Sequence, residues 1–155
     1  MKMRSIIILA AIPIALLLQG CLFYPRFYDV SARSPYAEMM GKKFVLKQDC
    51  YACGNVKAGK LSVGVPGRFL PAVSPLFINK KLDNGIVIAG ILNQGSVFTI
   101  VGCIDQYDPE NGHFGSFKAT FETPSFQGVI FDVSELTDMA KVPPEFLDSL
   151  AKPLE

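Results

Sequence analysis

From residue 42 onward, glycine and proline divide the chain into short segments, and this pattern limits the possible folds more than any other feature. Apolar and polar residues alternate in several segments; residues 116–122, for example, place Phe117, Ala119 and Phe121 on one face. Residues 96–104 are apolar on both faces, which is typical of a fully buried strand. The fold is therefore expected to be mainly β, a small antiparallel β-barrel or sandwich. The expected strands are residues 43–49, 60–65, 76–81, 85–92, 96–105, 116–122 and 127–133.

Turn signals separate these segments. Asp83-Asn84-Gly85 is a hairpin signal, and Asn93-Gln94-Gly95 is expected to join residues 85–92 to residues 96–105. Helices are expected near the C-terminus. Ser134 would cap a short helix from Glu135 to about Ala140, and the prolines at 143 and 144 would begin another that runs towards Ala151.

The N-terminus carries a different pattern, that of a segment made for export. Lys2 and Arg4 precede residues 5–18, a run of 14 residues without a charge. A membrane-spanning helix needs about 20 residues, and Pro13 would disturb such a helix. A cleaved signal segment, helical during export, fits both observations.

The end of this segment, Leu18-Gln19-Gly20-Cys21, resembles the lipobox of bacterial lipoproteins. The resemblance implies cleavage between Gly20 and Cys21 and a diacylglyceryl lipid, with further palmitate-type acyl chains, on Cys21. Leu22 stands where an aspartate favours inner-membrane retention in Gram-negative members of this family, so the outer membrane is expected if the source is Gram-negative. The alternative is an ordinary signal peptide or membrane anchor that happens to contain a cysteine.

These features predict three regions: a signal peptide over residues 1–20, a lipidated N-terminus and tether over 21–41, and one β-rich domain with a helical tail over 42–155. Residues 86–100 are also similar to the central hairpin of bacterial SH3-like barrels, in which Gly-Ile-Leu-x-x-Gly-Ser leads into an alternating strand. That similarity implies an SH3-like barrel.

Charge excludes one class of partner. After the signal, 13 cations and 14 acids remain, a net charge of −1, and lysine and arginine do not cluster. A chain so nearly neutral is a poor nucleic-acid binder. No second apolar run approaches membrane-spanning length, so the predicted membrane contact is through the lipid.

Three cysteines remain after Cys21, and an exported domain meets an oxidising environment. We expect a structural disulfide between Cys103 and either Cys50 or Cys53. The alternatives are a short Cys50–Cys53 bridge, unpaired buried thiols, a redox pair at Cys50 and Cys53, or a zinc site of Cys50, Cys53, Cys103 and His113. Haem attachment is excluded because glycine, not histidine, follows Cys53.

No catalytic set is evident. The chain has one histidine and no Gly-x-Ser-x-Gly sequence, and its acids lie in ordinary turns and strand faces. The sequence therefore predicts a non-catalytic envelope lipoprotein that binds a protein or envelope polymer and needs no cofactor besides its covalent lipid. The alternative is an envelope thiol-redox or zinc-binding protein centred on Cys50 and Cys53.

Overall fold

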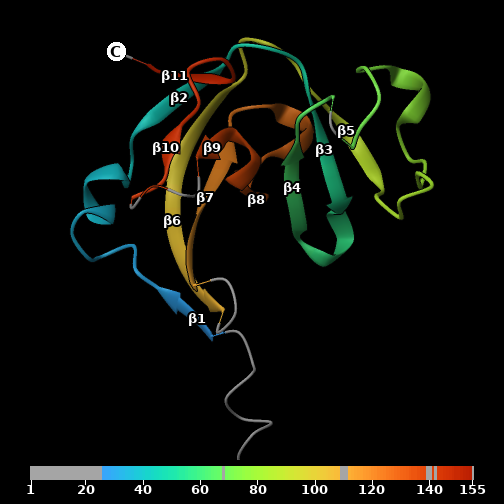
Figure 1. Ribbon diagram of the computed structural model, residues 1–155. Coiled ribbons are helices and arrows are strands. Elements are labelled where there is room, and N and C mark those ends of the chain that lie inside the picture. Colours follow the sequence, from blue (N-terminus) through green and yellow to red (C-terminus); the bar gives the residue numbers. More distant parts are fainter. Residues whose placement is uncertain (1–25, 68, 109–111, 139–140, 142, 155) are drawn as a thin grey trace, which may run out of the picture.

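The computed structural model describes residues 26–67, 69–108, 112–138, 141 and 143–154 (Figure 1). The predicted signal peptide, its cleavage site between Gly20 and Cys21, and the predicted lipid site at Cys21 lie outside the described residues.

The chain folds mainly into β-strands, as the sequence predicts. Nine strands formed by the described residues share one sheet, in the order β11–β2–β6–β7–β8–β4–β3–β5 with β1 added beside β6. Neighbouring strands are antiparallel, except for the parallel pair β4 and β8. The sheet curls into a half-barrel (Figure 1). The strands are β1 (Arg26–Asp29), β2 (Lys43–Leu46), β3 (Cys50–Asn55), β4 (Lys60–Gly64), β5 (Ile88–Leu92), β6 (Val97–Asp108), β7 (Gly112–Phe121), β8 (Ile130–Asp132), β9 (Thr137–Asp138), β10 (Glu145–Phe146) and β11 (Ala151–Pro153), and the 3-10 turns are η1 (Tyr36–Met39), η2 (Val56–Ala58), η3 (Pro75–Phe77), η4 (Pro124–Phe126) and η5 (Ser134–Leu136).

The half-barrel contains one long bent ribbon. β2 pairs with β6 and β3 pairs with β5, and a single register covers both pairs, from Lys43↔Thr99 to Cys50↔Leu92. Cys50 comes seven residues after Lys43, and its partner Leu92 comes seven residues before Thr99. The register is therefore unbroken across the bend. At the bend, the N–H of Gly95 donates to the carbonyl of Leu46 at 2.9 Å.

This ribbon corrects the predicted hairpin at residues 93–95. β5 pairs with β3, and β6 pairs with β2 and β7, so these two segments do not pair with each other. Gly95 has φ of 86°, a left-handed conformation that glycine adopts without strain, and it bends the ribbon there. The Asp49 carboxylate accepts the N–H of Gln94 at 2.7 Å and completes the bend. Residues 86–100 thus do not form the hairpin that their similarity to SH3-like barrels implies.

The folded domain begins earlier than predicted. β1 lies within the expected tether, residues 21–41, yet it pairs with the far half of β6. Val30, which follows β1, is only 3% exposed and belongs to the main core. The N–H of Gly41 then donates to the carbonyl of Ile100 at 2.9 Å. The structured domain therefore includes residues 26–41.

The main core lies inside the curl and is rich in phenylalanine. Phe146 of β10 lies within 4.2 Å of the Phe44 ring centre and 5.6 Å of that of Phe98. This packing explains why the predicted C-terminal helices are not found. The described residues there form η5 and the strands β9, β10 and β11, because a short helix gains little without packing.

None of the helical segments in the described residues is long and apolar enough to cross a membrane.

A long connection, residues 65–87, covers the other face of β3 and forms a second, smaller core. The buried hydroxyl of Tyr51 holds it, donating to the carbonyl of Ala72 at 2.8 Å and accepting the N–H of Ser74 at 2.9 Å. The predicted turn at residues 83–85 is confirmed, with Gly85 at φ of 85°. The strand expected over residues 76–81 is not formed; η3 and an isolated bridge take its place.

Candidate functional site

Cys50, Cys53 and Cys103 are free and buried in the structure. Cys50 and Cys103 lie in the main core, and Cys53 lies in the second core, on the opposite face of β3. Opposite faces leave Cys50 and Cys53 pointing apart. Cys103 stands on β6, which does not pair with β3. The predicted disulfide between Cys103 and Cys50 or Cys53 is therefore not present in this structure.

The surroundings of the three thiols favour their protonated form. Burial, with smaller contributions from Asp49 and Glu135, raises the pKa of Cys50 to about 12. Burial likewise raises the pKa of Cys53 and of Cys103 to about 11. The thiolate is the form that attacks disulfides and binds metals, and redox pairs usually gain it at a helix N-terminus. Here the pair stands on a strand, which favours a packing role.

The structure does not gather the four residues of the candidate zinc set. The side chain of His113 on β7 is 61% exposed, with Nδ1 3.1 Å from the Asp105 carboxylate and its ring 5.0 Å from that of Tyr107. The three thiols are instead buried in two separate cores. Within the described part of the chain, no group of three or more His, Cys, Asp or Glu side chains could hold a metal ion.

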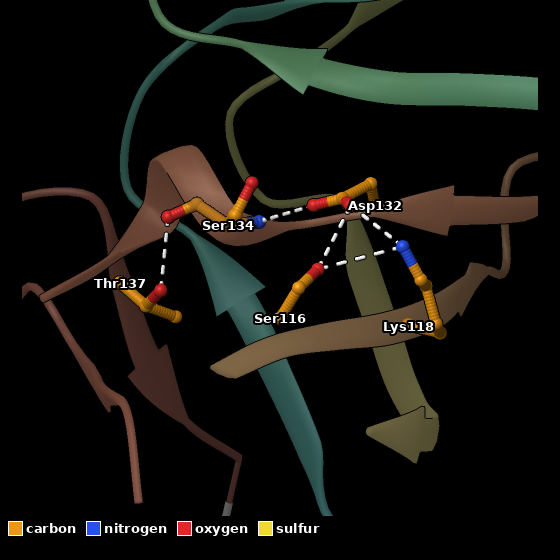
Figure 2. Close-up of polar contacts among 5 residues, drawn as sticks. All are labelled: Ser116, Lys118, Asp132, Ser134 and Thr137. Carbon is orange, nitrogen blue, oxygen red and sulfur yellow. Dashed lines mark hydrogen bonds and ion pairs between the residues drawn. The ribbon is translucent and has the colours of Figure 1, made fainter. Parts of the chain in front are cut away.

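A polar cluster joins β7, β8 and η5 around Asp132 (Figure 2). Its carboxylate accepts hydrogen bonds from Lys118 Nζ at 2.6 Å, Ser116 Oγ at 2.8 Å and the N–H of Ser134 at 2.9 Å. Burial opposes ionisation of Asp132, but these hydrogen bonds together outweigh it and lower the pKa of the carboxyl. Thr137 extends the cluster by donating its hydroxyl to the Ser134 carbonyl at 2.9 Å.

The Asp132 cluster contains a serine and a lysine side by side, but its geometry suits a clamp. A lysine acts as a base only when neutral, whereas Lys118 Nζ is held in an ion pair 2.6 Å from the Asp132 carboxylate. The Ser116 hydroxyl already donates to the same carboxylate. The ion pair therefore fastens β7 to β8 on the sheet face opposite the Phe117 core residue.

An apolar hollow of about 590 Å³ lies between the long connection and the C-terminal segment. A neighbouring hollow of about 350 Å³ shares Leu70, Ile86 and Glu135 with it, and we refer to the two hollows together as the groove. The larger part is lined by Val65, Pro66, Phe69, Leu70, Asn84, Ile86, Glu135 and Leu147.

Side chains of the connection fix the shape of this groove. Leu70 is buried in the second core, while its neighbour Phe69 is 67% exposed. Asn84 links two segments of the long connection that line the groove. Its amide nitrogen donates to the Phe69 carbonyl at 3.0 Å, and its amide oxygen accepts the N–H of Ile86 at 3.1 Å. Opposite them, the Glu135 carboxylate accepts the N–H of Val65 at 2.9 Å. The larger hollow of the groove thus has mainly apolar walls with one carboxylate, while the smaller hollow is also lined by Asn55, Lys60 and Ser62.

The sequence interpretation did not find this groove. Prolines at 66, 71 and 75 predict a long connection there, but nothing in the local pattern places it against Glu135, many residues later. The one available signal is apolar side chains, such as Phe69 and Leu70, in a proline-rich segment that would otherwise be expected to be polar.

No protein-family model matches the chain, and no curated protein or solved structure is significantly similar to it.

Proposed function

We propose that this chain is a cell-envelope lipoprotein whose β domain is a non-catalytic binding module. In this proposal the signal is cleaved before Cys21, the lipid on Cys21 anchors the chain, and the domain is presented at a membrane surface, the outer membrane if the cell is Gram-negative. The observation that carries the proposal is the Leu18-Gln19-Gly20-Cys21 sequence at the end of a short uncharged run.

The start of the folded domain supports this proposal. β1 begins at Arg26, five residues after Cys21. Five residues of extended chain span at most about 18 Å. A lipid on Cys21 would therefore hold β1 close to the membrane. Stable attachment needs two or more acyl chains, as the lipoprotein modification provides.

The groove is the proposed binding surface of the module. Its volume of about 590 Å³ lies within the range of about 300–1,000 Å³ that is usual for ligand sites. Apolar walls formed by Leu70, Ile86 and Leu147 suit an apolar segment of an envelope protein, and Glu135 suits a basic residue beside it. The buried, protonated thiols support a packing role for the cysteines in place of the redox or zinc alternative.

The anchor is tested by Cys21→Ala. Wild-type protein should incorporate labelled palmitate and be cleaved before Cys21, while the Cys21→Ala variant should incorporate none and should keep its uncleaved signal. Palmitate incorporation into the Cys21→Ala variant would contradict the lipoprotein assignment. A serine substitution at Cys103, inside the core, serves as the matched cysteine control and should leave the labelling unchanged.

The groove is tested by photo-crosslinking. A photoreactive phenylalanine replaces Phe69, which lines the groove, or Leu76, which is similarly exposed but lies outside it. After irradiation of intact cells, defined adducts with an envelope protein should form from position 69 and not from position 76, and Ile86→Lys should abolish them. Equal adduct formation from both positions would contradict binding in the groove.

A further inference from the structure

Exposed aromatic side chains gather at the end of the sheet where the domain begins. Figure 1 shows β1 and the adjoining ends of β6 and β7 at the bottom of the molecule, away from β11 and the long connection. At this end Phe27 is 63% exposed, Tyr28 41% and Tyr107 37%. All four side chains of β1 face solvent. Aromatic side chains are usually buried to a greater extent, so this cluster requires an explanation.

The aromatics project from both faces of the sheet. Arg26 pairs with Tyr107 and Tyr28 pairs with Asp105, which places these side chains on one face. Phe27, between them along the strand, points to the other face. A flat partner surface laid against one face of the sheet would cover only half of the cluster. A partner that surrounds the end of the sheet would cover all of it.

We propose that this end of the sheet enters the headgroup layer of the membrane, with Phe27, Tyr28 and Tyr107 as its contacts. This inference rests on the proposed lipid anchor at Cys21, because Phe27 and Tyr28 come only six and seven residues after the cysteine that carries the lipid. Tyrosine, whose apolar ring has one polar end, is enriched at the membrane–water interface, which suits Tyr28 and Tyr107, and Phe27 adds an apolar ring beside them. The domain thus has a second membrane contact, made by side chains, in addition to the lipid.

Charge and backbone at this end suit the headgroup layer better than the hydrocarbon core. Arg26 supplies a cation that can pair with lipid phosphate. Asp105 faces inward, its side chain 18% exposed and contacted by His113, and Asp29 lies at the far end of β1. Among the described residues, β1 pairs with β6 alone. Its unpaired backbone groups need water, which the headgroup layer contains and the hydrocarbon does not.

This placement also orients the rest of the domain. The long connection lies away from β1 (Figure 1), so the groove that its residues line would face the aqueous side. The proposed groove would then be open to protein partners, while the opposite end of the molecule is held on the lipid.

The chain has no tryptophan, so a single introduced tryptophan reports on one position. Full-length lipidated Phe27→Trp and Leu76→Trp variants are reconstituted into phosphatidylcholine–phosphatidylglycerol vesicles with bromine near the headgroup end of the acyl chains. Leu76 is 73% exposed on η3 and serves as the matched control. The tryptophan of Phe27→Trp should be quenched several-fold more by the brominated lipid than that of Leu76→Trp, and should be protected from aqueous iodide.

Flotation of the vesicles separates failure of this inference from failure of the lipid anchor. If the protein floats with the vesicles but both tryptophans respond equally to bromine and iodide, the anchor stands and the side-chain contact is refuted. A shift of the Phe27→Trp emission to shorter wavelength without bromine quenching would mean that another protein surface covers the aromatics, which also overturns the inference. If the purified protein carries no lipid and does not float, both proposals fall.

Discussion

The hydroxyl of Tyr51 is expected to hold the long connection over β3, and Tyr51→Phe tests this directly. The substitution removes one oxygen and keeps the ring, so it opens no cavity of consequence in the second core. It deletes two hydrogen bonds, one to the carbonyl of Ala72 at 2.8 Å and one from the N–H of Ser74 at 2.9 Å. The ring itself is fully buried.

The expected loss of stability depends on whether water can replace the Tyr51 hydroxyl as the hydrogen-bond partner of Ala72 and Ser74. A net hydrogen bond contributes about 0.5–1.5 kcal/mol, and a buried group left unpaired costs more. Ala72 is exposed and Ser74 is half-buried, so water can replace part of what is lost. We therefore expect Tyr51→Phe to lower the free energy of unfolding by about 1–2 kcal/mol. Tyr107→Phe, at an exposed site, should change it by less than about 0.5 kcal/mol.

Two measurements test this expectation. Chemical denaturation gives the change in the free energy of unfolding, and hydrogen exchange gives the local effect, because the Ser74 amide loses its acceptor. Its exchange should speed up more than that of core amides in β7, since the connection can open without global unfolding. An unchanged Ser74 exchange rate with a stability loss below about 0.5 kcal/mol would refute the role given to Tyr51.

Three further predictions concern the clamp, the second core and the thiols. The ionised Asp132 carboxylate is expected to stabilise the fold by about 1–3 kcal/mol, as is usual for charge-assisted hydrogen bonds. Because the pKa of Asp132 is lowered in the folded state, this stabilisation is complete above the unfolded pKa of about 3.9 and is lost as the pH falls through the folded pKa. Denaturation at several pH values should therefore show a gap between wild type and Asp132→Asn that is constant above about pH 5 and narrows below about pH 4; a gap independent of pH would contradict the ion pair. Gly64→Ala should destabilise the protein by about 1–3 kcal/mol in thermal unfolding, because an added methyl group would lie 2.5 Å from Cys53 Sγ and from Leu70 Cδ1. Gly102→Ala should be nearly neutral, because its methyl group would lie 3.5 Å from the nearest atom, Ser31 Oγ. Equal effects of the two substitutions would refute the close packing at Gly64. The three buried thiols should react with a thiol reagent at pH 8 only slowly until the protein is denatured, whereas fast labelling of the native protein would contradict their raised pKa values.

The fold class was readable from local patterns, whereas the strand pairing was not. Alternation in residues 116–122 gave β7 correctly, because one buried face imposes a period of two on the side chains. Residues 93–95 have the residues of a hairpin turn, but they form a bend in a ribbon whose partners lie on β2 and β3. The residue types in a turn indicate the local backbone conformation, whereas strand pairing depends on segments distant in sequence.

The C-terminal segment and the cysteines fail prediction for the same reason. Ser134 and the prolines at 143 and 144 are helix-start signals, yet Phe146 gains more by packing on Phe44 and Phe98 than a short helix could gain. The proposed envelope location predicts oxidised cysteines, whereas strand position decides whether two sulfurs can meet. Cys50 and Cys53 on opposite faces of β3 cannot meet without rebuilding the strand.

The candidate groove could not be predicted from local sequence patterns, because its lining residues come from segments distant in sequence. Leu70 and Ile86 belong to the long connection, and Glu135 comes from η5, far along the chain. Their meeting depends on the curl of the sheet, which no local sequence pattern encodes. The proposed export signal is the opposite case, because such a signal is recognised as a linear segment and needs no tertiary structure.

Mass spectrometry of the mature protein's N-terminal peptide tests the lipid anchor most directly. The expected peptide begins at Cys21 and carries the mass of a diacylglyceryl group with its acyl chains. A peptide that begins at Met1, or one that begins at Cys21 with an unmodified thiol, would contradict the account.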